Sequence, residues 1–252
     1  MGALHHGHAA LIRMARQIAG KGGTVLVSIF VNPTQFGPKE DFSAYPRPLR
    51  NDLKTCGDAG ADAVFLPSVT EMYPPEASVS INETFLSSVL CGRSRVGHFS
   101  GVCTVVAKLF HIVSPTHAIF GEKDWQQLAI IRRMVRDLDF DLEIIPCPTV
   151  REPDGLAASS RNAYLTEAER QLAPQIYAAL QTASKKLTPV KVVSEAVKLI
   201  TKIPGTRIDY IEAIDAQTLQ PLRQRRTEGR LAAAVFLGKA RLIDNIALPA
   251  MP

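Results

Sequence analysis

The first two-thirds of the chain alternate short apolar runs with amphipathic segments, and this alternation limits the fold more than any other feature. Thr24–Val31 (TVLVSIFV) is short and rich in β-branched residues, as expected of a buried parallel strand. Apolar residues recur at helical spacing on either side of it, in Gly7–Ala19 and Leu49–Gly60. Further strands and helices are expected at Ala63–Leu66, Val102–Val113, His117–Phe120, Asp124–Leu138 and Leu142–Pro146. The pattern predicts an α/β fold with a doubly wound, mostly parallel sheet.

The pattern changes near residue 150. Glu167–Leu187 and Val190–Ile203 have helical periodicity, and three strand-like runs follow at Arg207–Ile214, Leu231–Leu237 and Ala240–Asp244. We therefore predict two domains, residues 1–149 and residues 150–252, of which the second is a smaller α+β domain.

Composition and charge exclude several classes of protein. Hydrophobic residues make up 46% of the 252 residues, so the chain can form a packed core. No apolar run reaches the roughly 18 residues that a membrane span needs, and no signal peptide is recognisable. The net charge of +5 suits an anionic substrate and is too small to require nucleic acid. The densest basic stretch, residues 223–226, contains no aromatic residue, and we expect it to be a solvated surface loop.

The cysteines are scattered along the chain without CxxC or CxxH spacing, at Cys56, Cys91, Cys103 and Cys147. This spacing argues against a zinc site built from cysteine pairs. Free thiols are typical of a reducing compartment, so we expect a cytoplasmic protein.

His5 and His8 stand three residues apart where the first predicted helix begins. Residues at this spacing share a helix face, so both imidazoles can point at one ligand. Backbone N–H groups and the positive end of the helix dipole favour an anion there, and Gly7 allows a phosphate to approach closely. Metal binding, or no function at all, are the alternatives at this stage.

Two polar segments directly follow predicted strands, where ligands bind in open α/β sheets. Asn32 and Gln35 supply uncharged donors and acceptors that suit a hydroxyl or carboxylate, although the segment also fits a plain Pro/Gly turn. Lys123 is a point charge well placed for a phosphate. Asp124, beside it, has a structural alternative as the N-cap of the next helix.

Ser159, Ser160 and Arg161 lie in an irregular segment near the predicted domain boundary. Two hydroxyls and a guanidinium suit triphosphate oxygens, and a Ser/Asn-rich linker is the alternative. The chain contains no GxxxxGK[ST] loop, no GxGxxG after a strand and no GxSxG elbow. A P-loop NTPase, a dinucleotide-binding enzyme and an α/β-hydrolase therefore each lack their signature.

Together these segments closely resemble the pantoate–β-alanine ligase (pantothenate synthetase) family of the nucleotidyltransferase superfamily. The resemblance covers almost the whole chain and runs in the family's order: MGALHHGH (1–8), FVNPTQFG (30–37), YPR (45–47), GRSRVGHFSGVCTVVAKLF (92–110), FGEKDWQQL (120–128), REPDGLAASSRNAYL (151–165) and KARLIDN (239–245). It implies a Rossmann-like first domain of the HxGH nucleotidyltransferase type, related to class I aminoacyl-tRNA synthetases. The HxGH motif and a KMSKS-like loop correspond here to His5–His8 and Ala158–Asn162.

The resemblance implies a reaction in which ATP, pantoate and β-alanine give pantothenate, AMP and pyrophosphate through a bound pantoyl adenylate. It also implies a homodimer and Mg²⁺ on the triphosphate. No membrane or nucleic-acid partner is expected. The first step develops charge on phosphoryl oxygens, so preorganised cations and N–H donors are the main catalytic need.

By motif position, the residues that stabilise this charge and hold the leaving group are expected to be His5, His8, Lys123, Ser159, Ser160 and Arg161. The nucleotide-binding set implied by the resemblance is Met1, Gly7, Gly121, Lys123, Asp124, Val150, Ser159, Ser160 and Arg161. The pantoate and β-alanine side is expected to be formed by Asn32, Gln35, Tyr45, His98 and Gln127. The expected metal contact is Asp52, with Asn51 where a second acid is usual.

One departure from the family pattern raises an alternative function. Family members carry about one helix and one strand before the MGALH segment. Either the sequence begins at an internal methionine, or the protein lacks this strand and a sheet position next to the site is empty or filled differently. An inactive or impaired homologue is therefore one alternative, and another superfamily nucleotidyltransferase is the second. The FVNPTQFG and REPDGLAASSRN segments favour the ligase.

Overall fold

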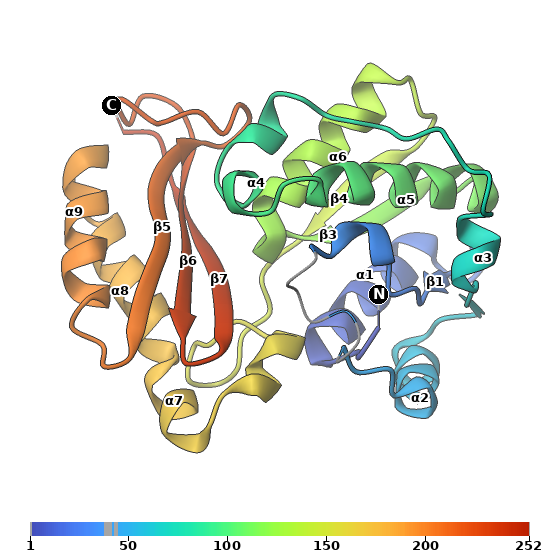
Figure 1. Cartoon of the computed structure of the whole chain (residues 1–252), viewed down its shortest axis with the longest axis horizontal. Helices are drawn as coiled ribbons and strands as arrows, with labels where there is room; N and C mark the ends of the chain where they lie inside the picture. Colours follow the sequence, from blue (N-terminus) through green and yellow to red (C-terminus); the bar gives the residue numbers. More distant parts are fainter. Residues whose placement is uncertain (1, 38–41, 43–44, 252) are drawn as a thin grey trace. The chain divides into compact units, whose positions relative to one another are not determined.

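The structure, a computed structural model, describes residues 2–37, 42 and 45–251 (Figure 1). The chain divides into two compact units. Unit 1 comprises Met1–Glu122 and Gln126–Pro148, and unit 2 comprises Lys123–Trp125 and Thr149–Pro252. The short segment around Lys123, which the sequence places in the first domain, therefore packs with the second unit.

Unit 1 has the predicted α/β architecture with parallel strands. β1 (Leu26–Ser28) pairs with β2 (Ala63–Phe65), and β3 (His117–Gly121) pairs with β4 (Glu143–Cys147). The helices of this part of the chain are α1 (His6–Ala19), α2 (Leu49–Ala59), α3 (Val69–Met72), α4 (Cys91–Ser94), α5 (His98–Val113) and α6 (Trp125–Asp137). Short 3₁₀ helices are η1 (Pro33–Gln35), η2 (Leu86–Ser88) and η3 (Glu122–Asp124). Helix α1 packs against β3 and β4, and α5 and α6 run beside the same pair (Figure 1).

The first strand is shorter and less buried than the strand expected over Thr24–Val31. Val25, Val27 and Ile29 are buried in one cluster with α1 and α2, whereas Leu26 is 38% exposed. The segment therefore buries one face rather than two, as alternating side chains do when only one side is covered. Within the described residues, hydrogen bonds join the parallel strands as two separate pairs rather than as one continuous ladder.

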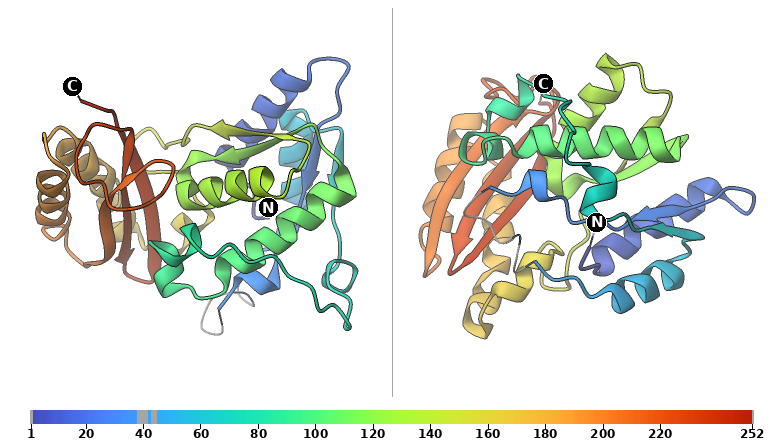
Figure 2. Two further views of the ribbon diagram at one scale, coloured as in Figure 1. Left: turned by 90° about the horizontal axis from the view of Figure 1, so that it is seen from above. Right: turned by 45° about the vertical axis from the view of Figure 1, so that its right-hand side comes forward.

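Unit 2 is the predicted small α+β unit. Its antiparallel sheet has the order β5 (Thr206–Asp215), β6 (Gly229–Leu237), β7 (Ala240–Leu248). Helices α8 (Pro174–Ser184) and α9 (Pro189–Ile200) cover one face of this sheet in both views (Figures 1 and 2). The remaining elements of the unit are η4 (Ser160–Tyr164) and α7 (Glu167–Leu172).

Two local details of unit 2 follow from single residues. Leu237 pairs with Ala240, so Gly238 and Lys239 form a two-residue hairpin turn in which Gly238 has φ +54°. The single helix expected over residues 167–187 is instead two helices, α7 and α8. The break lies before Pro174, whose ring lacks an N–H and clashes with the preceding turn of a continuous helix.

The four cysteines are free and buried. Among the described residues, no helix is both long enough and apolar enough to cross a membrane.

The basic stretch 223–226 is not uniformly solvated, which corrects the sequence expectation. Arg225 is 5% exposed. Its Nη1 donates to the carbonyls of Ser184 (2.9 Å) and Lys186 (2.8 Å), and its Nη2 donates to Pro249 (3.2 Å). A cation is favourable at the C-terminal end of a helix, where carbonyls lack intrahelical partners. Arg225 therefore ties the end of α8 to the segment that follows β7.

We expect Arg225→Ala to lower the free energy of unfolding by about 3 kcal/mol, because buried carbonyls lose their donors. Arg226→Ala is the matched control, since Arg226 is exposed in the same loop. Urea denaturation of the two variants measures the difference. Equal effects from the two substitutions would contradict the structural role of Arg225.

Candidate active site

His5 and His8 lie in contact at the start of α1, with their ring planes tilted by 43°. Their ring centroids are 4.0 Å apart. His5 Nδ1 accepts from Gly7 N (3.1 Å), and His8 Nδ1 accepts from His5 N (3.2 Å), so the two imidazoles form a reciprocal capping box. The structure thus confirms that the two rings share one end of the helix. The N–H of buried Gly7 is used in this cap.

This cap also determines which ring nitrogen carries the proton. An Nδ1 that accepts a hydrogen bond from a backbone N–H is unprotonated, so the proton of each neutral ring is on Nε2. Each ring is thereby an Nε2–H donor, and an anion such as a phosphate is the complementary ligand. A divalent metal would instead require an unprotonated Nε2.

Asp52, the expected metal contact, is 1% exposed in the first turn of α2. Its two oxygens accept from consecutive backbone amides: Oδ2 from Ala3 N (3.0 Å) and Oδ1 from Leu4 N (2.7 Å). A magnesium ligand keeps its oxygen open to the ion and its waters, and this carboxylate is instead enclosed. Among the described residues no group of three or more His, Cys, Asp or Glu side chains could hold a metal ion. The residues around Asp52 do not fit a protein-bound Mg²⁺.

Three of the residues expected to bind pantoate lie around η1 and the start of α5. Asn32 is 2% exposed, and its Nδ2 donates to Gly101 O (3.0 Å) and to Gln35 Oε1 (3.3 Å). His98 Nδ1 donates to Gln35 O (2.7 Å), and its Nε2 faces Arg95 Nη1 at 3.0 Å. The structure thus brings Asn32, Gln35 and His98 together.

Gly101 allows this close approach. A Cβ at this position would lie 2.5 Å from Thr34 O and 2.9 Å from Gln35 N, both of which are backbone atoms. Only a glycine in α5 lets η1 lie directly on the helix.

The other residues of unit 1 that were expected to bind substrate or nucleotide make fewer contacts with this group. Tyr45 joins the η1 segment through an edge-on contact with Phe36, with ring centroids 5.8 Å apart. Gln127 lies on α6, and its half-buried amide makes no hydrogen bond to a described residue. Gly121 ends β3, and a Cβ there would meet nothing within 4 Å, so packing among the described residues does not require a glycine. Met1 lies outside the described residues.

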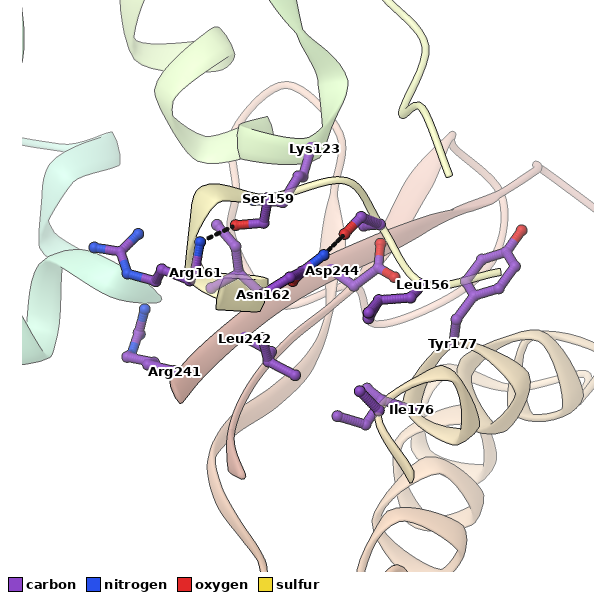
Figure 3. A pocket seen from close by; sticks show the side chains of 13 residues that line it. Lys123, Leu156, Ser159, Arg161, Asn162, Ile176, Tyr177, Arg241, Leu242 and Asp244 are labelled. Atoms are coloured by element: carbon purple, nitrogen blue, oxygen red, sulfur yellow. Dashed lines mark hydrogen bonds between the residues drawn. The ribbon is translucent and has the colours of Figure 1, made fainter. Parts of the chain in front are cut away.

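Unit 2 contains a pocket formed by the KMSKS-like loop, the Lys123 segment, α8 and β7 (Figure 3). Its lining includes three cationic side chains, Lys123, Arg161 and Arg241, together with Ser159. In Figure 3, Arg161 and Arg241 extend toward the same side of the pocket. The side chain of Lys123 is only 18% exposed and lies 3.8 Å from the exposed Asp124. The excess of positive charge suits a polyanion.

Local hydrogen bonds shape the loop that carries the serines. Glu152 N donates to Leu156 O (2.8 Å) and Ala158 N donates to Val150 O (2.9 Å), so residues 150–158 form a hairpin. Ser159 then caps η4, because its hydroxyl accepts from Arg161 N (3.3 Å). Ser160 is the first residue of η4.

Strand β7 supports both cationic segments of the pocket. Asp244 forms two hydrogen bonds with Arg151 (2.7 and 2.9 Å), which holds the hairpin, and the guanidinium of Arg151 lies 3.4 Å from the ring centroid of Tyr177. The neighbouring Asn245 is 5% exposed and donates to Lys123 O (3.1 Å). Both supporting side chains come from the segment KARLIDN.

A family model for pantoate-β-alanine ligase matches residues 1–247. The pantothenate synthetase of Akkermansia muciniphila is 53% identical over 252 residues, which covers 98% of this chain and 90% of that protein. The pantothenate synthetase of Thermotoga neapolitana is 51% identical over 253 residues, covering 98% and 89%. The chain belongs to the pantoate–β-alanine ligase family. The resemblance inferred from the motifs is confirmed, and with it the assignment as a ligase.

Solved structures of this ligase family have the same fold. The pantothenate synthetase crystal structure from Thermus thermophilus superposes with a TM-score of 0.94 at 43% identity, over 99% of this chain and 91% of that one. The pantoate-β-alanine ligase of Francisella tularensis, complexed with βγ ATP and β-alanine, has a TM-score of 0.80 at 37% identity, over 98% and 86%.

Two residues that line this pocket of unit 2 were not predicted as site residues from the sequence. Arg241 lines it while paired with Asp209 (2.6 Å). Asn162 lines it with a buried Oδ1 that has no hydrogen-bond partner among the described residues. Asn162 and Arg241 lie in segments that carried the resemblance, but spacing along the chain did not reveal their roles. A ligand donor would satisfy the orphaned oxygen of Asn162.

We expect Gly101→Ala to displace η1 and to raise the KM for pantoate on the order of 10-fold, because the added Cβ meets backbone that cannot turn away. The KM for ATP should change little. Steady-state kinetics with each substrate varied in turn measure both constants. Gly57→Ala is the control, since Gly57 is also within a helix but its added Cβ would meet nothing. Equal pantoate KM values in the two variants would contradict the proposed packing role.

Proposed function

We propose that this ligase joins pantoate to β-alanine through a pantoyl adenylate. In the first step a pantoate carboxylate oxygen attacks the α-phosphorus of ATP, the bond to the β-phosphate breaks, and pyrophosphate leaves. In the second step the amine of β-alanine attacks the acyl carbon, the acyl–phosphate bond breaks, and AMP leaves while the nitrogen loses a proton. The observation that carries the proposal is the group of Lys123, Ser159 and Arg161 on one pocket of unit 2.

The first step needs donors aimed at developing negative charge. His5 and His8 supply two Nε2–H groups, and Lys123 supplies an ammonium that is largely withdrawn from water. Ser159, Ser160 and Arg161 hold the β- and γ-phosphates and then the leaving pyrophosphate. None of these groups forms a covalent bond to the substrate, so positioning and electrostatics carry the step.

Pantoate is oriented by the amides of Gln35 and Gln127, with His98 and Tyr45 shaping the same side. Asn32 differs from these, because its donors and acceptor are engaged by Gly101, Gln35, Thr34 and Tyr73. Asn32 therefore contributes mainly by holding η1 in place. Gly121 and Asp124 accommodate the nucleoside, with Asp124 on the ribose, and the Val150 segment and Gly7 complete the nucleotide site.

Magnesium enters this proposal as part of the substrate, MgATP, with its ligands on the triphosphate oxygens. The enclosed carboxylate of Asp52 is not assigned to it. The resemblance supports two further proposals, a homodimer and a cytoplasmic location. The buried free cysteines are compatible with a reducing compartment.

The experiment that tests this function is exchange of labelled pyrophosphate into ATP by the 252-residue chain. Exchange that depends on pantoate is expected, because adenylate formation is reversible while pyrophosphate is present. Adding β-alanine should convert the adenylate to pantothenate and AMP. Exchange without pantoate would instead indicate another nucleotidyltransferase, and no exchange from a folded sample that binds no ATP would indicate an inactive homologue.

We expect Lys123→Ala to lower the exchange rate on the order of 10²-fold or more, because one preorganised cation at the phosphates is lost. Lys198→Ala is the control, since Lys198 is an exposed lysine of α9 in the same unit. A Lys123→Ala enzyme that turns over as fast as the Lys198→Ala enzyme would remove Lys123 from the mechanism.

A further inference from the structure

Asp52 has a buried negative charge that no lysine or arginine of the described residues neutralises. Its carboxylate is 1% exposed and lies in the first turn of α2, where the helix dipole favours an anion. Burial and the nearby charge of Asp52 raise the pKa of the Cys56 thiol, one turn further along the helix. Burying this carboxylate costs free energy, which its two hydrogen bonds to backbone N–H groups offset.

Those hydrogen bonds go to two consecutive amides of a single segment. Oδ2 accepts from Ala3 N at 3.0 Å and Oδ1 from Leu4 N at 2.7 Å. One planar carboxylate that holds two successive N–H groups determines the orientation of both peptide planes, which a single bond could not do. The next peptide plane belongs to His5, the N-cap of α1.

The held segment has a backbone conformation that it would not adopt unaided. Ala3 has φ +50°, in the left-handed region that is unfavourable for a residue with a Cβ. The surrounding structure must therefore impose it. The carboxylate of Asp52, bonded to Ala3 and to the residue after it, is the polar contact that does so.

The histidine pair depends on this segment. His5 N donates to His8 Nδ1, so the orientation of the peptide plane after Leu4 sets where the His8 ring lies. The side chain of Leu4 packs against the cluster beneath α1, which leaves the backbone direction to be set by Asp52. A rotation of this segment would move both Nε2–H donors away from the position of the phosphate.

We propose that Asp52 is a positioning residue for His5 and His8, acting through the amides of Ala3 and Leu4, and not a metal ligand. This inference rests on the proposed function, because it assumes that the two rings stabilise the phosphate during adenylation.

The test is a double-mutant cycle on pantoate-dependent pyrophosphate exchange, using the full chain. Asp52→Asn replaces one acceptor by an NH₂ group that faces a backbone N–H, and should lower kcat on the order of 10-fold or more. His8→Ala should lower kcat on the order of 10²-fold. If Asp52 acts through the histidines, the double variant should be less impaired than the product of the two single losses predicts, because one of the two rings that Asp52 positions is already gone.

Two further variants separate positioning from metal binding and from misfolding. Asp52→Glu keeps the charge but moves the oxygens by one methylene group, so positioning predicts a loss like that of Asp52→Asn, whereas a metal ligand would be preserved. Ala3→Gly on the Asp52→Asn background should restore part of the rate, because glycine adopts φ +50° without steric cost. Asp58→Asn is the control, since Asp58 is exposed on the same helix and pairs with Lys54.

The outcomes are distinguishable. A normal rate for His8→Ala would overturn the proposed function itself. If His8→Ala is slow and the double variant loses the full product of the two single reductions in rate, only the positioning role would be overturned. A shift of the Mg²⁺ concentration dependence in Asp52→Asn would also overturn it, in favour of a metal ligand. Three results together would support the inference. Asp52→Asn still unfolds cooperatively above the assay temperature, the dependence of its rate on Mg²⁺ concentration is unchanged, and the two single losses do not multiply in the double variant.

Discussion

A polar side chain that is withdrawn from water must find its hydrogen-bond partners inside the protein, and in this chain such side chains hold loops in place. Asp52 holds the segment before α1. Gln126 accepts from Cys91 N and donates to the carbonyls of Leu86 and Val89, which fixes the irregular chain around η2. Asn245 holds the carbonyl of Lys123. Loss of any one of these side chains would leave buried backbone groups without partners.

This constraint bears on the proposed chemistry, because the residues proposed for catalysis stand on loops and first turns rather than within long elements. Electrostatic stabilisation of a transition state requires donors that are already in position when charge develops. The histidine pair of unit 1 is positioned by capping bonds, and the loop of unit 2 that carries Ser159 is positioned by the Arg151–Asp244 pair. Each unit thus holds its own candidate residues in place.

Periodicity predicted the elements well where local pattern and packing agree. The α/β class and the small α+β C-terminal unit with its three strands followed from spacing alone. The expected long helix was wrong at Pro174, although proline is itself a sequence signal. The short elements between residues 69 and 94 were not predicted, because they lack a repeating apolar pattern. The chain at η2 and α4 depends on hydrogen bonds to the distant Gln126.

The sequence by itself determined the family, the order of the motifs and the residue types that a phosphate requires, since these depend on chemistry that each residue carries with it. Only the tertiary structure decided what the buried polar residues do. Asp52 was expected to be a metal ligand, but its carboxylate accepts hydrogen bonds from backbone N–H groups. Arg225 was expected to be a surface charge, but it is buried and donates to backbone carbonyls. The reason is physical: whether a charged side chain faces water, an ion or a peptide N–H depends on which distant segments pack around it, and spacing along the chain does not contain that information.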